Sequence, residues 1–108
     1  MSRYAAIDIG SNSIRMLAAD VHSPHSGQPM QVLAADRQVV RLGMTVFREG
    51  KLAAAEMELA CQVLTRMAEQ YRRLDVMGIR AVGTAALRDA SNRDEFLARA
   101  AAILGTCL

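Results

Sequence analysis

The sequence of 108 residues predicts at most one domain, of the α/β class. Two short apolar runs, residues 4–9 and 14–21, have the length and composition of buried strands. Residues 51–74 repeat apolar side chains at helical spacing, and a further apolar run follows at 76–83. Strands on both sides of a helix are typical of a sheet with helices packed against it, and the predicted element order is β-β-β-α-β-α.

The first two strands are predicted to form an antiparallel hairpin. Only Gly10 to Ser13 separate the two runs, which suits a short loop. Because both runs are apolar at consecutive positions, we expect both faces of the sheet to be covered. A loop with two prolines at 22–29 precedes a third strand predicted over 30–42, and residues 43–50 are expected to form a connection.

The predicted helix over 51–74 places its apolar residues, among them Cys61, on one stripe. This thiol is therefore expected to be buried and unreactive. The strand at 76–83 follows this helix, so it should lie parallel to the first strand and beside it, through a right-handed crossover. The sheet is therefore predicted to be mixed.

A second helix is predicted over about 93–104. Ser91 or Asn92 is its expected N-cap, with an acidic residue three positions later completing a capping box. Gly105 is the expected C′ residue, because glycine readily adopts the left-handed conformation that ends many helices.

The first hairpin loop is a candidate phosphate site. Gly10 allows a backbone angle closed to other residues, and its small neighbours let an anion approach the main-chain N–H groups. Arg15 adds a fork suited to phosphate oxygens, and Asp8 is placed to orient a magnesium-bound water. An ordinary hairpin turn explains the same small polar residues equally well.

The second candidate is the loop at 83–89, after the fourth strand. Ligands favour the carboxyl end of parallel strands, where Thr84 offers a hydroxyl and Arg88 a positive charge. A plain strand-to-helix connection is the alternative. If the first and fourth strands are neighbours, one cleft is expected to hold Asp8, Ser11, Asn12, Ser13, Arg15, Thr84 and Arg88. That set suits phosphate with a divalent metal.

The composition excludes several other classes. A formal net charge of +2 is too small to indicate binding to nucleic acid or to an anionic membrane. No apolar segment has the length of a signal peptide or a membrane span, and the two cysteines match no metal spacing. A cytoplasmic chain with free thiols is expected.

The motif "AAIDIGSNSIRML" at 5–17 resembles the opening of the exopolyphosphatase and guanosine pentaphosphate phosphohydrolase (Ppx/GppA) family. The resemblance continues through "VVRLG" at 39–43 and "AVGTAALRDASNRDEFL" at 81–97. It implies the actin-like, ribonuclease H-like fold and Mg²⁺-dependent hydrolysis of terminal phosphoanhydrides. It further implies that Gly10 to Ser13 form the first phosphate loop, that Asp8 lies at the metal, and that Arg15, Thr84 and Arg88 contact phosphate.

The sequence departs from the family pattern in three places. Gly83-Thr84-Ala85-Ala86 stands where the family has Ala-Thr-Ser-Ala, and Ala53 replaces a serine cap. The family's catalytic glutamate and second, glycine-rich phosphate loop come after residue 108. Residues 1–108 are therefore expected to be a truncated N-terminal part of the first actin-like domain, with no catalytic residue of their own and negligible hydrolysis of polyphosphate.

Other readings stay open at this point. One is an ATP-dependent kinase of the same fold, and another is a non-catalytic module that binds phosphate or an alarmone. The sequence does not distinguish polyphosphate from guanosine pentaphosphate as the substrate. A sheet with an unpaired edge also favours association, which leaves a homodimer as one expected state.

Overall fold

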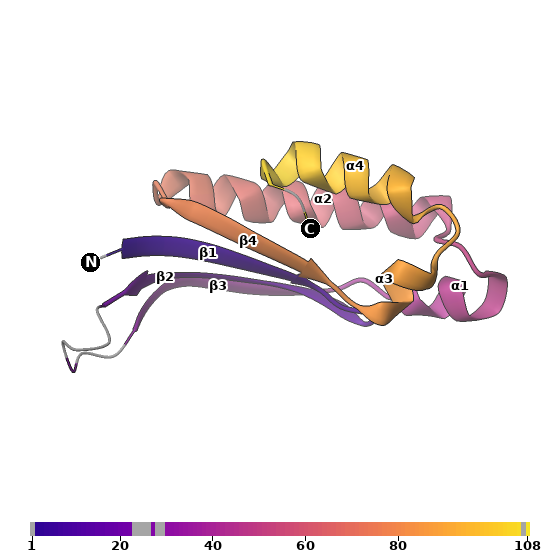
Figure 1. Cartoon of the computed structure of the whole chain (residues 1–108), viewed down its shortest axis with the longest axis horizontal. Coiled ribbons are helices and arrows are strands. Elements are labelled where there is room, and N and C mark those ends of the chain that lie inside the picture. The colour runs from indigo at the N-terminus through magenta and orange to yellow at the C-terminus, as the bar shows by residue number, and fades with distance from the viewer. Residues whose placement is uncertain (1, 23–26, 28–29, 107) are drawn as a thin grey trace.

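The computed structural model describes residues 2–22, 27, 30–106 and 108. A four-stranded sheet with the order β3-β2-β1-β4 is its centre (Figure 1). The predicted sequence of elements is confirmed, with two short helices added: most of residues 43–50, expected as a connection, form α1, and the loop expected at 83–89 contains α3. The elements are β1 Ser2–Ile9, β2 Ser13–Val21, β3 Gln31–Val39, α1 Leu42–Glu49, α2 Ala54–Arg73, β4 Gly78–Gly83, α3 Ala85–Asp89 and α4 Arg93–Leu104.

The strand pairing brings the two candidate loops to one end of the sheet. β1 runs antiparallel to β2, with Ile9 opposite Ile14, and parallel to β4, with Ile9 opposite Gly83. The first and fourth strands are therefore neighbours, as predicted. The β1–β2 turn and the end of β4 lie together at the end of the sheet where α1 and α3 also lie (Figure 1).

One face of the sheet is covered and the other is open. Exposure alternates along β1: Ala5, Ile7 and Ile9 are buried, while Tyr4, Ala6 and Asp8 are exposed. Figure 1 shows α2 and α4 on the buried side. Within the described residues, the expectation that both faces are covered is wrong. Alanine on the open side of the strand made the run look continuously apolar, although leaving so small a side chain exposed costs little.

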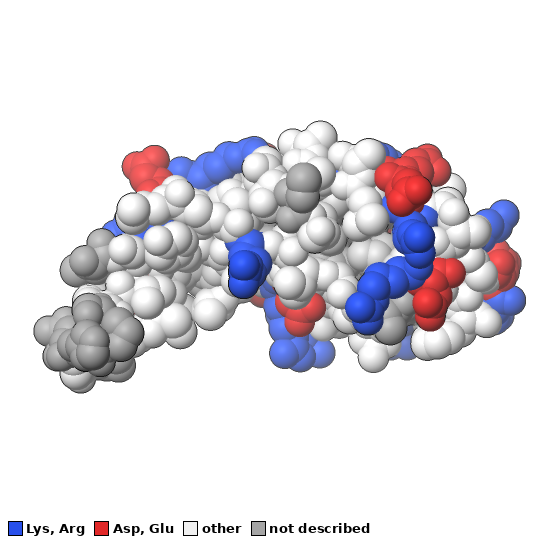
Figure 2. Space-filling model, in the orientation of Figure 1, with Lys and Arg blue, Asp and Glu red and all other residues white. Residues whose placement is uncertain are grey.

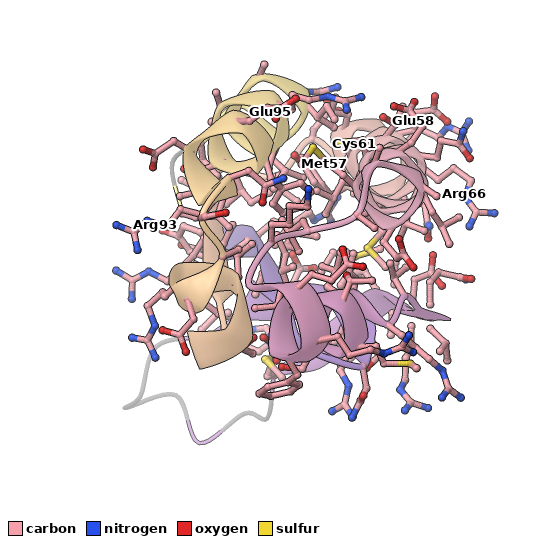
Figure 3. The ribbon with its side chains drawn as sticks, turned by 90° about the vertical axis from the view of Figure 1, so that its right-hand side faces the viewer. Met57, Glu58, Cys61, Arg66, Arg93 and Glu95 are labelled. Atoms are coloured by element: carbon pink, nitrogen blue, oxygen red, sulfur yellow. The ribbon has the colours of Figure 1, made fainter. Side chains whose placement is uncertain are left out.

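The covered face packs against α2, and α4 packs against α2 in turn. Figure 3 shows Met57 and Cys61 in the region between the two helices. Cys61 is buried, as predicted, and desolvation by this burial raises the pKa of its thiol. The buried hydroxyl of Tyr71 on α2 donates a hydrogen bond to the carbonyl oxygen of Leu104 at the end of α4.

The helix ends are only partly as predicted. Gly105 ends α4 in the left-handed conformation, with φ of 77°. Asn92 occupies the N-cap position of α4, but its side chain makes no capping hydrogen bond, so the expected capping box is absent. Its side-chain amide instead forms two hydrogen bonds with the backbone of Leu52, which precedes α2. Asn92 Oδ1 accepts from the Leu52 N–H at 2.9 Å, and Asn92 Nδ2 donates to the Leu52 carbonyl at 3.0 Å.

Among the helices of the described residues, none combines the length and the apolar character that crossing a membrane requires.

Candidate phosphate site

The β1–β2 turn is held tightly by its own backbone. The Gly10 N–H donates to the Ser13 carbonyl at 2.9 Å. A Cβ atom on Gly10 would lie 2.8 Å from that same oxygen, which is closer than side chains tolerate. Position 10 therefore requires glycine, because a larger residue would place its Cβ atom against the Ser13 carbonyl oxygen. The expectation of an unusual backbone angle is wrong, because the φ of Gly10 lies outside the left-handed range.

The second loop is bonded directly to the first. The Thr84 N–H donates to the Ile9 carbonyl at 3.2 Å, which continues the β1–β4 ladder past the end of β4. The hydroxyl oxygens of Ser11 and Thr84 lie 3.3 Å apart, within hydrogen-bonding distance. These two residues are separated by 73 positions in the sequence, so the fold brings the two predicted loops into contact.

The start of α1 supports the same loop from a third direction. The Val40 N–H donates to the Asn12 carbonyl at 3.1 Å, and the Gly43 N–H donates to the Ser11 carbonyl at 3.0 Å. These bonds fix the backbone of the loop relative to the segment that enters α1. The sequence analysis missed Gly43. A Cβ atom there would lie 2.9 Å from the Ser11 Cβ, so glycine lets α1 approach the loop closely.

Asp8 and Arg15 face the open side of the sheet. They are directly opposite each other in the β1–β2 ladder, and both are exposed. With Arg37 on β3 and Arg80 on β4, they line a shallow depression with a volume of about 610 Å³. Arg37 and Arg80 were not among the predicted site residues. Arg37 lies opposite Arg15, and like charges at such positions repel each other unless an anion or a carboxylate lies nearby.

Arg88 lies on α3, beyond Thr84, and is exposed. It lines a different depression, of about 390 Å³, together with Gly83 and Arg93. In the described part of the chain, the residues expected in a single cleft are thus divided between two depressions. Asp8 and Arg15 share one depression and Arg88 lines another, while Ser11 and Thr84 meet between the two strand ends. Ser13 is only 9% exposed, which leaves little of its hydroxyl for a ligand.

Charged side chains lie along the whole face that Figure 2 shows. They are most crowded at the end that carries α1 and α3, which is also the end of the two loops. Among the described residues, no group of three or more His, Cys, Asp or Glu side chains could hold a metal ion. A divalent cation at Asp8 would therefore need oxygen ligands from a phosphate and from water.

The sheet order and its mixed strand directions define an actin-like α/β domain. The crystal structure of the Aquifex aeolicus member of the Ppx/GppA family matches with a TM-score of 0.87 and 31% sequence identity, over 98% of this chain and 33% of that chain. The model of the Ppx/GppA phosphatase family matches residues 19–108. The chain belongs to the Ppx/GppA phosphatase family.

Two curated relatives extend the match across the first loop. Exopolyphosphatase 2 of Mycobacterium tuberculosis is 37% identical over 108 residues, which are all of this chain and 34% of the relative. The guanosine-5′-triphosphate,3′-diphosphate pyrophosphatase of Aliivibrio fischeri is 40% identical over 102 residues, or 94% of this chain and 20% of the relative. The chain thus spans about a third or less of the length of these relatives, and it aligns with their N-terminal part.

Proposed function

We propose that this chain supplies the phosphate-holding part of a phosphoanhydride hydrolase that acts on inorganic polyphosphate or guanosine pentaphosphate. The observation that carries the proposal is the 3.3 Å contact between Ser11 and Thr84, which joins two loops rich in hydrogen-bond donors at one end of the sheet. One of the two relatives is named for polyphosphate and the other for the guanosine nucleotide, and both names support the same class of reaction.

The proposed phosphate ligands come from both loops. Main-chain N–H groups of residues 10–13 and the hydroxyls of Ser11 and Thr84 would donate to phosphate oxygens, with the Asn12 amide as a further donor. Arg15 and Arg88 would add charge from either side of this pair of loops. Holding the oxygens in place and neutralising their charge is the main source of rate in phosphoryl transfer.

The residues present fit a magnesium ion that arrives with the substrate. Asp8 is exposed at the end of β1, and Mg²⁺ typically uses one or two carboxylates, substrate phosphate oxygens and several waters. When bound, the ion would neutralise charge on the phosphate chain. Asp8 would hold it, directly or through water, and would be positioned by its place in the strand ladder between Arg15 and Val82.

Neither loop, residues 10–13 or 83–89, contains a glutamate that could serve as general base for the attacking water. In the described part of the chain, the glutamates all belong to helices: Glu49, Glu56, Glu58, Glu69 and Glu95. Glu58 is engaged by Arg99 at 2.9 Å. We therefore expect this chain by itself to bind a phosphate chain and to release phosphate negligibly.

Titration calorimetry with magnesium and inorganic tripolyphosphate tests the binding. A hydrogen bond to a charged group contributes about 1.5–3 kcal/mol, so Arg15→Ala should weaken the affinity roughly 10- to 100-fold. Thr84→Val also removes one hydrogen bond to the charged phosphate and should weaken the affinity roughly 10-fold. Arg66→Ala is the matched control, because Arg66 is an exposed arginine that points away from α2 into solvent (Figure 3).

Three results would contradict the proposal. The first is no binding by the unaltered chain at millimolar tripolyphosphate. The second is an equal loss for Arg15→Ala and Arg66→Ala, which would indicate attraction by net charge alone. The third is robust magnesium-dependent phosphate release by this chain, measured by a colorimetric phosphate assay, which would mean that one of its own side chains serves as the base.

A further inference from the structure

Phe47 is the most exposed of the large apolar side chains in the described residues. It lies on α1 with 81% of its surface exposed, whereas Phe96 on α4 is completely buried. A phenylalanine ring that is exposed to solvent offers its π-face to a ligand, and burying that ring on binding is favourable. Val39 and Val82 are also exposed near the loops, opposite Ser13 and Asp8, but Phe47 has an aromatic ring and they do not.

Gly43 fixes the distance between this ring and the loop. A Cβ atom placed on Gly43 would lie 3.4 Å from Cε2 of Phe47 and 2.9 Å from the Cβ of Ser11. Because Cε2 of Phe47 and Cβ of Ser11 lie 3.4 Å and 2.9 Å from the same Cβ position, the two atoms are at most about 6.3 Å apart. Ser11 in turn contacts Thr84. An exposed aromatic face thus adjoins the place where both loops offer donors.

We propose that Phe47 is a stacking platform for the purine base of a nucleoside polyphosphate whose phosphates occupy the two loops. This inference rests on the proposed phosphate site and names the substrate class that the site would prefer. An aromatic side chain stacks on a base through its π-face, and inorganic polyphosphate has no such group. A nucleoside polyphosphate is long enough to reach from Ser11 to the ring.

The local backbone makes the platform rigid enough for this role. The Gly43 N–H bond to the Ser11 carbonyl ties the first turn of α1 to the loop. Leu42 and Val46 of α1 are buried and anchor the helix to the core, which leaves Phe47 on the exposed side. Met44, three positions earlier in the helix, is 46% exposed and extends the apolar surface.

The chain contains no tryptophan, so a single substitution provides a specific reporter. In Phe47→Trp, magnesium guanosine 5′-triphosphate should quench the indole fluorescence in a saturable way, and magnesium tripolyphosphate should not. Leu59→Trp is the matched control, because Leu59 is also exposed, at 46%, but lies on α2. The fluorescence of Leu59→Trp should decrease only through the inner-filter effect, because the nucleotide absorbs part of the exciting light.

Affinity measurements on Phe47→Ala complete the test. Loss of base stacking should weaken the binding of guanosine 5′-triphosphate roughly 5- to 100-fold and leave tripolyphosphate binding unchanged. Equal losses for both ligands, or no loss for either, would overturn the platform while leaving the phosphate site intact. Failure of the unaltered chain to bind either ligand would instead overturn the phosphate site, and the platform with it. Because Phe47 is exposed, the alanine variant is expected to fold.

Discussion

Asn92→Ala is the most informative test of how the site end of the molecule is held together. The Asn92 side chain both accepts from the Leu52 N–H and donates to the Leu52 carbonyl, across 40 positions of sequence. It thereby joins the segment that enters α2 to the segment that enters α4. Alanine removes both bonds and keeps the backbone conformation accessible, so the change isolates this connection.

The size of the effect follows from the two bonds and from the burial of their partner. A single intramolecular hydrogen bond contributes about 0.5–1.5 kcal/mol, and a buried group left without a partner costs about 1–3 kcal/mol. Leu52 is only 2% exposed, so water replaces the lost bonds poorly. We expect the free energy of unfolding to fall by about 2 kcal/mol. With an unfolding entropy of about 2.1 cal/mol/K per residue, this lowers Tm by roughly 9 °C.

Chemical and thermal denaturation monitored by circular dichroism measure this change. The neighbouring variant Ser91→Ala is the control, because Ser91 is exposed and its recorded hydrogen bond to Gly50, from its backbone N–H, survives the substitution. It should alter stability by less than about 0.5 kcal/mol. If Asn92→Ala were as stable as Ser91→Ala, the side-chain contacts with Leu52 would be energetically unimportant and the reasoning refuted.

Two further predictions concern pH. The hydrogen bond from Arg3 lowers the pKa of Asp20, so this pair should stabilise the fold above about pH 3.9 and lose its effect as the pH falls through the lowered pKa. Asp20→Asn should therefore make the decrease of Tm at acid pH smaller. An unchanged decrease would assign it to other carboxylates. Burial raises the pKa of Tyr71, so stability should fall as the pH rises above about 10. Tyr71→Phe should make that fall smaller, leaving the part due to the buried Cys61 thiol, and should cost about 1 kcal/mol in urea unfolding through the lost bond to Leu104. An alkaline limb identical to that of the unaltered chain would contradict this assignment.

The parts of the fold that were predictable have strong local signals or obey a topological rule. Apolar runs separated by Gly10 to Ser13 indicated the opening hairpin, and Gly105 indicated the end of α4. The neighbouring position of β4 followed from the right-handed crossover of parallel strands. From these elements alone, the meeting of Ser11 and Thr84 could be expected.

The parts that were missed depend on tertiary contacts. The helix α1 spans only eight residues and includes Gly43, which lowers helix propensity, so its local signal is short and interrupted. Its contact with Ser11 appears only in the folded chain. Asn92 was read as a helix cap because asparagine favours that position, yet the Leu52 backbone is a better-matched partner for both polar atoms of its amide.

The orientation of Asp8 and Arg15 could have been obtained from strand parity. Ile7 and Ile9 are buried, and side chains alternate between the two faces of a strand, so Asp8 between them must face the other way. A shift of one residue in the register of β1 would exchange these faces. It would expose both isoleucines and place the Asp8 carboxylate in the core, where an unpaired charge is very unfavourable. The packing of the core therefore selects the one register in which Asp8 and Arg15 lie exposed beside the first loop. For this reason the candidate phosphate site and the hydrophobic core cannot be altered independently along β1.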